Sequence, residues 1–225
     1  MTGILPILSF LWTHEPDLLA PKVATEARKE ADRNMAVKHA KVLDTAQLKR
    51  LLDFVDSGLH PLRDRVMILL SFKAGLRSQE IAGLDWTAAC DAESELRTDN
   101  FLIGSHIAKK GHERTVPMNP ELYRALRTLR EARPADTAII YGVRRARMSP
   151  NSVTVYLFRL YEKLGFEGCS SHSGRRTCIT ALARKANLHD CSLKDVQLFA
   201  GHKHLDTTEC YLEPSSNISR LVSAI

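Results

Sequence analysis

The chain has 225 residues, of which 44% are hydrophobic and 26% charged, so its composition predicts a soluble, folded protein of one large domain or two small ones. These values exclude a disordered chain, a collagen-like fibre and a polytopic membrane protein. The formal net charge of +6 at pH 7 weakly favours a polyanionic partner.

The cysteines and the N-terminal residues predict the cellular compartment of the protein. The five cysteines are an odd number and form no Cys-x-x-Cys pair, whereas a secreted disulfide scaffold uses an even, dense set. The apolar residues 4–12 lack a basic flank, are interrupted by Pro6 and are too short to span a bilayer. We therefore expect reduced thiols, no membrane segment and a cytoplasmic protein.

The first predicted elements are helical. Residues 1–40 predict an N-terminal extension or helical linker, because residues 22–41 are mostly Ala, Lys, Arg, Glu and Asp. The compact part begins near Lys41. Asp44 followed three residues later by Gln47 predicts a capping box that starts a helix ending near Gly58.

The middle of the chain predicts a buried helix and a β-hairpin. Residues 63–74 are apolar on nearly all sides, which is typical of a buried helix, and Gly75 ends it before a short helix at 78–83. Two extended runs at 101–108 and 114–118 flank a polar, glycine-containing link, a pattern that predicts antiparallel strands.

The remainder predicts helices at 121–132, 150–164, 175–186, 193–200 and about 208–212. After Pro214, apolar residues at 218, 221, 222 and 225 predict a short amphipathic helix that must dock on another surface to be stable. The fold class we expect is mainly α with a small antiparallel β-sheet, or α+β.

Several polar motifs occur in a fixed order along the chain. They are Ala-Gly-Leu-Arg77-x-x-Glu, a lysine before Arg-x-Val-Pro in the hairpin, His172-x-x-Arg175, Gly-His202, and Tyr211 nine residues further on. Each motif alone also suits ordinary caps or core residues, but all of them in this order are specific. The set resembles the catalytic signature of the tyrosine recombinase (phage integrase) family over about residues 41–213. The resemblance implies that family's catalytic-domain fold, in a short form without the usual N-terminal core-binding domain.

The resemblance also implies roles for these residues. Tyr211 is the expected nucleophile on a DNA phosphodiester, giving a 3′-phosphotyrosyl intermediate. Arg77 and Arg175 are expected to clamp the non-bridging oxygens, since guanidiniums bind them bidentately and stay charged. His202 is expected to add a donor, and His172 a donor or a proton acceptor. Neither a metal nor another cofactor is expected.

The hairpin lysine that protonates the leaving 5′ oxygen has two candidates. Lys109 occupies the family position counted back from Pro117, while Lys110 has the preferred following glycine, and we favour Lys109. Glu80 is expected to orient an arginine, and Arg176 to add positive charge where many members carry histidine.

A basic cluster precedes the helix predicted at residue 150. Arg144, Arg145 and Arg147, with Asn151 and Ser152 at the start of the helix, are candidate DNA contacts. A solvated basic loop is an equally good interpretation of the same residues.

The leading functional hypothesis is a site-specific DNA recombinase of integrase, invertase or resolvase type, from a mobile element. Its expected partners are double-stranded DNA, further copies of the chain in a tetramer held by residues 214–225, and an accessory protein. Its expected location is the nucleoid. The alternatives are a catalytically silent DNA-binding regulator and a type IB topoisomerase-like relaxing enzyme. Cys169-x-x-His172 and His189-x-Cys191 also suggest zinc ligands, but their spacing is irregular for a structural site.

Overall fold

The computed structural model describes residues 40–142, 146–212 and 222–223. The chain divides into two units, Met1–His39 and Ala40–Ile225, and all described residues belong to the second. The predicted N-terminal extension, except for residue 40, and most of the predicted C-terminal tail therefore lie outside the described residues.

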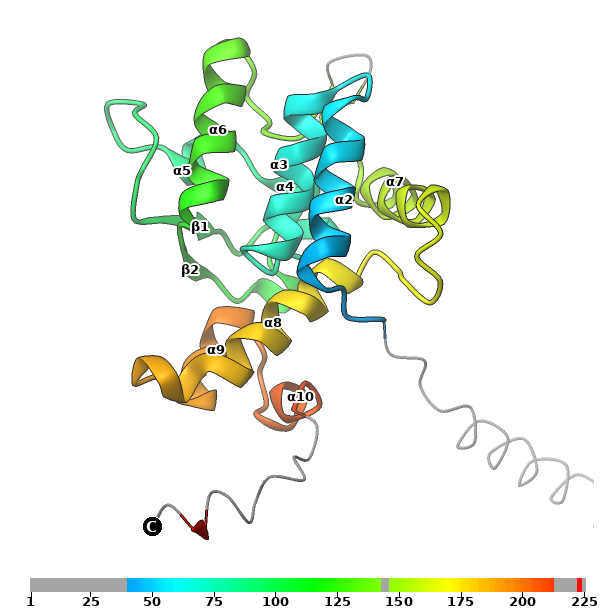
Figure 1. The fold of residues 1–225 in the computed structure, drawn as a ribbon. Helices are drawn as coiled ribbons and strands as arrows, with labels where there is room; N and C mark the ends of the chain where they lie inside the picture. Colours follow the sequence, from blue (N-terminus) through cyan, green and yellow to red (C-terminus); the bar gives the residue numbers. More distant parts are fainter. Residues whose placement is uncertain (1–39, 143–145, 213–221, 224–225) are drawn as a thin grey trace, which may run out of the picture. The chain divides into compact units, whose positions relative to one another are not determined.

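The buried helix α3 (Pro61–Phe72) is at the centre of the fold and contacts α2, α6 and α8 (Figure 1). Its first residue, Pro61, has the φ angle that a helix start requires. In α2 (Thr45–Asp56) the predicted capping box is confirmed: the Gln47 N–H donates to the Asp44 carboxylate at 2.7 Å, and the Asp44 N–H donates to Gln47 Oε1 at 3.0 Å.

The turn after α3 places the first motif arginine. Gly75 adopts a left-handed φ of +63°, and the Leu76 N–H donates to the Leu70 carbonyl at 3.1 Å, so the helix ends and the chain changes direction here. The chain then enters the short helix α4 (Ser78–Gly83), with Arg77 at its N-cap.

The β-hairpin consists of β1 (Asn100–Ile103) and β2 (Arg114–Pro117), paired antiparallel with Phe101 opposite Val116. The expectation that the first strand runs to residue 108 is wrong. The Ile107 and Ala108 N–H groups both donate to the Gly104 carbonyl, so the chain turns there and continues into a 3-10 helix, Lys109–Gly111. The turn buries Ile107 against α4, where Gly83 leaves room for it.

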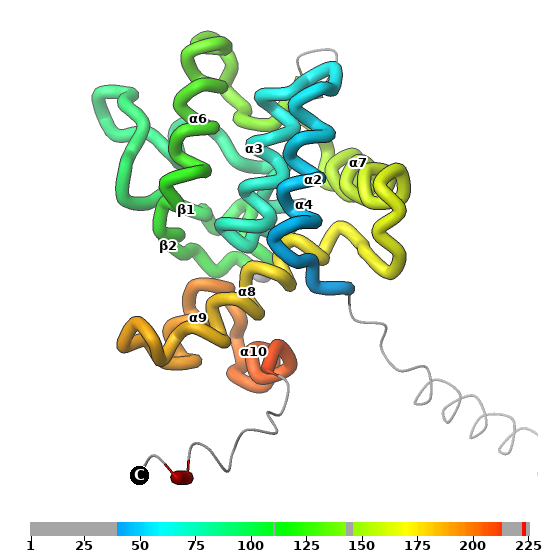
Figure 2. Tube along the Cα trace, viewed as in Figure 1, coloured from blue at the N-terminus to red at the C-terminus, as the bar shows by residue number. Residues whose placement is uncertain are grey.

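The other helices follow the predicted order with shifted ends (Figure 2). They are α5 (Trp86–Ala89), α6 (Pro120–Ala132), α7 (Pro150–Lys163), α8 (Ser173–Lys185), α9 (Leu193–Ala200) and α10 (Asp206–Glu209), with a 3-10 helix at Ala186–His189. α5 was not predicted from the sequence. The last helix is shorter than expected and ends at Glu209, so Tyr211 follows it.

Two apolar clusters stabilise the structure. The larger one joins α2, α3, α6, α7 and the hairpin, and the smaller one consists of Ile179, Ala186, Val196 and Ala200, with Tyr211 packed against it. Burial in the larger cluster is worth about 1.5–3 kcal/mol for each large apolar side chain. The expected fold class, mainly α with a small antiparallel sheet, is confirmed. In the part of the chain that the structure describes, no helix has the length and apolar character needed to span a bilayer.

Candidate active site

The carboxylate of Glu80 is fully buried and is held by two arginines. It accepts hydrogen bonds from the backbone N–H of Arg77 at 2.9 Å and from Arg77 Nη1 at 3.1 Å. Arg114 adds a bidentate pair, with Nη1 and Nη2 at 2.8 and 2.9 Å from the two carboxylate oxygens. Burial alone would raise the pKa of Glu80, but the hydrogen bonds and charges of Arg114 and Arg77 lower it overall. Glu80 is therefore ionised and fixes Arg77 at the start of α4.

Arg175, on the first turn of α8, is buried with its guanidinium facing the ends of two other elements. Its Nη1 donates to the Gly75 carbonyl, and its Nη2 donates to the Ala200 carbonyl at 2.7 Å. Burial, followed by the charge of Arg77, lowers the pKa of Arg175 to about 10. Arg175 is still positively charged at neutral pH, and the charge of Arg77 acts on it.

His202 follows the left-handed Gly201 that ends α9 and contacts three other side chains. Its Nε2 lies 3.0 Å from Arg175 Nη2, and its Nδ1 lies 2.9 Å from Thr208 Oγ1. Because a guanidinium only donates, Nε2 must accept, so the proton resides on Nδ1 and is donated to Thr208. In this arrangement His202 has no N–H free for a phosphate. The donor role expected from the sequence requires His202 to give up one of these contacts when DNA binds.

Tyr211 lies against His202, with the two rings stacked at 5.7 Å between centroids and an interplanar angle of 22°. The guanidinium carbon of Arg176 also lies 5.4 Å from the centroid of the Tyr211 ring. The tyrosine is half-buried and packs against the smaller apolar cluster. The structure thus brings the last motif residue to the same place as Arg175 and His202.

His172 is the N-cap residue of α8 and lies near the positive charges of the site. Desolvation, followed by the charges of Arg175, Arg77 and Lys109, lowers the pKa of His172, which keeps it neutral at pH 7. The electrostatic effect of Lys109 places that exposed lysine near the other motif residues. The side chain of Lys110 lies outside the described part of the structure.

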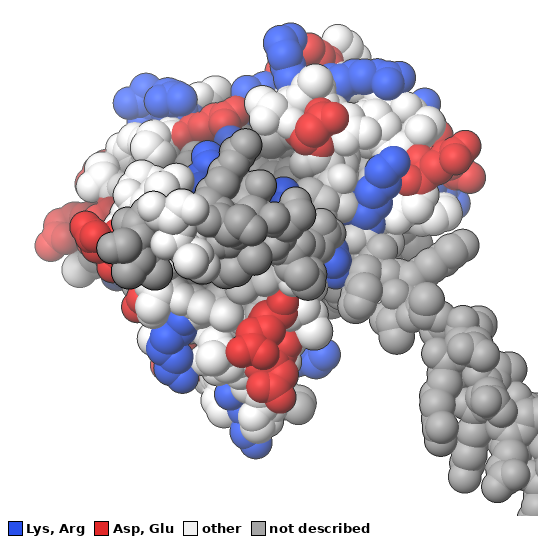
Figure 3. All heavy atoms as spheres, turned by 60° about the horizontal axis from the view of Figure 1, so that its bottom comes forward, with Lys and Arg blue, Asp and Glu red and all other residues white. Residues whose placement is uncertain are grey.

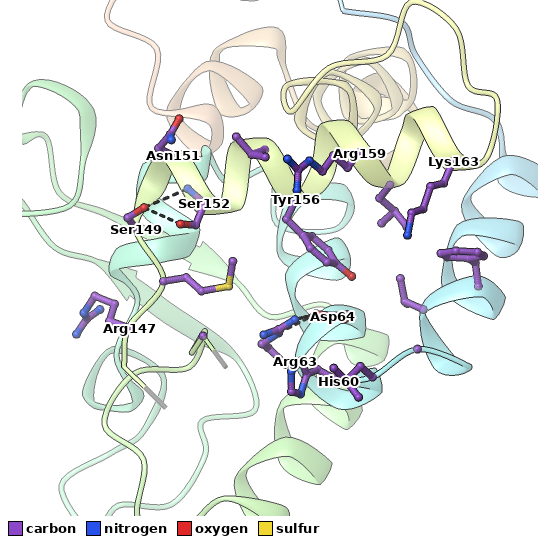
Figure 4. A pocket seen from close by; sticks show the side chains of 18 of the residues that line it. His60, Arg63, Asp64, Arg147, Ser149, Asn151, Ser152, Tyr156, Arg159 and Lys163 are labelled. Atoms are coloured by element: carbon purple, nitrogen blue, oxygen red, sulfur yellow. Dashed lines mark hydrogen bonds and ion pairs between the residues drawn. The ribbon is translucent and has the colours of Figure 1, made fainter. Parts of the chain in front are cut away.

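Three of the predicted DNA contacts, Arg147, Asn151 and Ser152, line a cavity of about 1140 Å³ between α7 and the turn that precedes α3 (Figure 4). Asn151 and Ser152 lie exposed on the first turn of α7. Arg147 forms an ion pair with Asp85 and donates to the Ala82 carbonyl at 3.3 Å, so its guanidinium is already engaged. Arg144 and Arg145 lie outside the described residues.

The floor of this cavity contains a buried ion pair. Arg63 Nη2 lies 2.6 Å from Asp64 Oδ1, and Arg63 Nη1 donates to the Tyr141 carbonyl at 3.0 Å. Tyr156 points from α7 toward this pair (Figure 4). Burial, followed by the charge of Asp64, raises the pKa of Tyr156, which therefore stays protonated. These groups are satisfied by one another and have a structural role.

The charges on the described surface are mixed. On the face turned forward in Figure 3, Lys and Arg side chains are interspersed with Asp and Glu among the residues drawn in colour. The concentration of positive charge lies instead within the site, where Arg77, Arg114 and Arg175 surround the one carboxylate of Glu80. Among the described residues, no group of three or more His, Cys, Asp or Glu side chains could hold a metal ion.

The fold and the grouped arginines, histidines and tyrosine define a protein of the tyrosine recombinase class, and the comparisons establish the family. The profile of the Phage integrase family matches residues 41–217, so the chain belongs to this family. The tyrosine recombinase XerC of Actinobacillus pleuropneumoniae serotype 7 (strain AP76) is 29% identical over 208 residues, which cover 90% of this chain and 62% of that protein. The tyrosine recombinase XerA of Thermococcus kodakarensis (strain ATCC BAA-918 / JCM 12380 / KOD1) is 27% identical over 175 residues, covering 76% of this chain and 57% of that protein. The chain thus spans about six-tenths of the length of these relatives.

Solved structures confirm the fold. The Tn1549 transposon integrase in complex with a circular intermediate DNA aligns with a TM-score of 0.65 and 19% identity, covering 81% of this chain and 64% of that one. The XerA recombinase crystal structure aligns with a TM-score of 0.64 and 20% identity, covering 83% and 65% of the two chains. The expected tyrosine recombinase catalytic-domain fold is therefore observed.

Two residues of the site were not among the candidates from the sequence. Arg114 was noticed only as part of the Arg-x-Val-Pro motif, and nothing local indicates that it pairs with Glu80 at 34 residues' distance. Thr208 was noticed only as part of the Thr-Thr-x-x-Tyr motif and of a short helix, although its hydroxyl orients His202. The Thr-Thr-x-x-Tyr spacing is the one local signal that could have suggested it.

Proposed function

We propose that this chain is the catalytic domain of a site-specific DNA recombinase that cuts and rejoins DNA through a 3′-phosphotyrosyl intermediate. The observation that carries the proposal is the stacking of Tyr211 on a histidine that Arg175 itself holds. Tyr211, the proposed nucleophile, Arg175, part of the proposed clamp, and the neutral His202 come from separate parts of the chain and lie in contact.

In the proposed reaction the Tyr211 hydroxyl attacks the phosphorus of a DNA phosphodiester. A P–O bond to tyrosine forms, the bond to the 5′ oxygen breaks, and the developing negative charge lies on the non-bridging oxygens. Arg77, fixed by Glu80, and Arg175, fixed by two carbonyl groups, are preorganised donors for these oxygens. Each such donor is commonly worth about 10²–10³ in rate.

Two further groups move protons in this scheme. His172 is neutral because burial, followed by nearby positive charges, lowers its pKa, so it can accept the tyrosine proton. Lys109 donates a proton to the departing 5′ oxygen. Religation reverses these steps on a new DNA end, since the covalent link conserves the energy of the broken bond.

Double-stranded DNA is the proposed substrate. Among the structures with the same fold, the XerH recombinase is bound to its difH substrate and the Tn1549 integrase to a circular intermediate DNA. For this chain, Asn151 and Ser152 at the start of α7, together with Arg144 and Arg145, are the proposed contacts outside the active site. The net charge of +6 is consistent with phosphate binding.

We further propose residues 41–213 as the catalytic domain, 1–40 as an extension or linker, and 214–225 as the tail through which copies assemble into a tetramer on DNA. An accessory protein, a place in the nucleoid and origin in a mobile element belong to the same proposal.

The direct test is capture of the covalent intermediate. The full chain is expressed with DNA that flanks its coding sequence, the cells are lysed in denaturant, and DNA attached to protein is sequenced. We expect adducts at defined sites with the wild-type chain and none with Tyr211→Phe.

The matched control is Tyr123→Phe, which removes the hydroxyl of another partly buried tyrosine, on α6. It should form adducts at the wild-type level. Binding of DNA without adducts in the wild-type chain, or adducts that persist in Tyr211→Phe, would contradict the proposal.

A further inference from the structure

Arg114 occupies the point where three segments of the site meet. The residue lies at the start of β2, on the hairpin that also carries Lys109. Its Nη1 and Nη2 bind both oxygens of Glu80, the carboxylate that fixes Arg77. Its Nε donates at 3.0 Å to the Phe199 carbonyl, in the last turn of α9 before Gly201 and His202.

Each of the three nitrogens of this guanidinium donates a hydrogen bond to a protein group. The side chain of Arg114 is only 8% exposed, compared with 18% for Arg77. A bidentate contact with a fully buried carboxylate fixes the plane of a guanidinium, and the third contact fixes its long axis. Protein groups thus engage all three nitrogens of Arg114, so we expect its effect on the reaction to pass through the residues that it contacts.

We infer that Arg114 is a positioning residue of the proposed strand-cleavage site: its guanidinium sets Arg77 through Glu80 and holds the end of α9, with His202, against the hairpin. This inference rests on the proposed function and adds to it a residue that links the hairpin to Arg77 and to the segment that carries His202. Lysine cannot replace it, because a single ammonium group cannot bind both carboxylate oxygens in one plane and also reach the Phe199 carbonyl.

The absence of a side chain at Gly201 supports the same inference. A Cβ atom there would lie 3.1 Å from Arg114 Cδ and 3.2 Å from its Nη1. The backbone before His202 thus approaches the guanidinium as closely as a glycine allows. Any displacement of Arg114 is transmitted to the segment that carries the histidine.

The test compares Arg114→Gln and Arg114→Lys with Arg127→Gln, which removes an exposed arginine on α6 paired only with Glu131. Covalent adduct formation is measured in single turnover with saturating DNA, and DNA affinity is measured separately. We expect adduct formation to fall about 10²-fold for Arg114→Gln and about tenfold for Arg114→Lys, in the range of lost preorganised donors, with DNA affinity changed less than threefold. Arg127→Gln should match wild type. Equal losses in affinity and rate, or wild-type rates for Arg114→Gln, would overturn the inference.

A double-mutant cycle separates positioning from folding. In an Arg77→Ala background, Arg114→Gln should reduce the rate by less than about tenfold, because the arginine that it positions is already absent. The neutral pair Glu80→Gln with Arg114→Gln removes the buried charge and should melt close to wild type. If this pair also regains the wild-type rate, Arg114 serves stability alone and the inference fails.

A second readout needs no DNA and is independent of the proposed function. In protein labelled with ¹⁵N-arginine and ¹³C-histidine, Arg114→Gln should shift and broaden the side-chain NMR signals of Arg77 and His202, and Arg127→Gln should not. If wild type forms no adduct, the proposed function fails, and these spectra still decide whether Arg114 positions the two residues. Unchanged signals would overturn the inference.

Discussion

Arg175 Nη2 and His202 Nε2 lie 3.0 Å apart, and this contact fixes the protonation state of the histidine. A guanidinium cannot accept a hydrogen bond, so Nε2 carries no proton and the imidazole is neutral. Burial and then the charge of Arg175 lower the pKa of His202 to about 4 in agreement with this arrangement. The residue can change its contacts on binding DNA without first losing a proton.

The low pKa of His202 predicts a loss of stability in mild acid. An unfolded histidine has a pKa near 6.5, so between about pH 6.5 and 4 the unfolded chain binds a proton that the folded chain does not. Stability therefore falls as the pH drops through this window, and His172, whose pKa is also lowered, adds to the loss. Urea midpoints at pH 7, 6 and 5 should decline less steeply for His202→Gln than for wild type. The surface substitution His106→Gln should keep the wild-type slope, and an equal slope for His202→Gln would count against the predicted shift.

Gly174 should not tolerate a side chain. A Cβ atom there would lie 2.3 Å from Ser71 Oγ and 2.7 Å from Phe72 Cδ2, where α8 crosses α3. We expect Gly174→Ala to lower the free energy of unfolding by about 1–3 kcal/mol and to slow adduct formation, because α8 carries Arg175. Gly142→Ala, whose Cβ would meet its nearest atom at 3.6 Å, is the matched control for urea unfolding. Comparable stability of the two variants would refute the crowding argument.

Gly201→Ala tests the approach of Arg114 to the end of α9. The residue has a φ of +62°, which alone costs a non-glycine residue about 1–2 kcal/mol. Gly165, with a φ of +68° and no atom within 4 Å of its Cβ position, has the conformational cost without the crowding. Both variants should lose similar stability, but only Gly201→Ala should also slow adduct formation. Equal rates for the two would show that the close approach is unimportant.

Lys109 can be tested through the leaving group. Replacing the 5′ oxygen at the cleavage site by sulfur gives a thiolate that departs without being protonated. We expect Lys109→Ala to slow cleavage of ordinary DNA by about 10²–10⁴ and to cleave the sulfur-containing DNA at nearly the wild-type rate. Lys110→Ala should cleave both substrates normally. If sulfur restores Lys110→Ala instead, the assignment between the two lysines is reversed.

Local rules were sufficient for much of the fold. The capping box of Asp44 and Gln47 and the end of the helix before Gly75 depend on residues within one helical turn of each other, and both were predicted. The early end of β1 was not, because apolar side chains resume at Ile107 and Ala108 and no proline interrupts the run. Burial of Ile107 in the space above Gly83 draws them into a turn instead.

The sequence indicated the residues of the candidate site but not the contacts between them. Ordered motifs identified Arg77, Arg175, His202 and Tyr211, which the structure brings together. The pairing of Arg114 with Glu80 is a tertiary contact between a strand and a helix, and neither residue's neighbours in sequence encode it. The ion pair between Arg147 and Asp85 is also a tertiary contact, so it could not be predicted from the sequence around either residue.

The small apolar cluster beneath Tyr211 has a consequence for dynamics. Its four fully buried members belong to α8, α9 and the link between them, apart from the core around α3. Segments with few buried contacts open with free energies well below that of global unfolding. Amide hydrogens from Val196 to Tyr211 should therefore exchange with deuterium through local openings while those of α3 stay protected. This local equilibrium would then set the fraction of time that Tyr211 spends away from His202. Substitutions in the small cluster would change that fraction without changing the melting temperature of the whole domain.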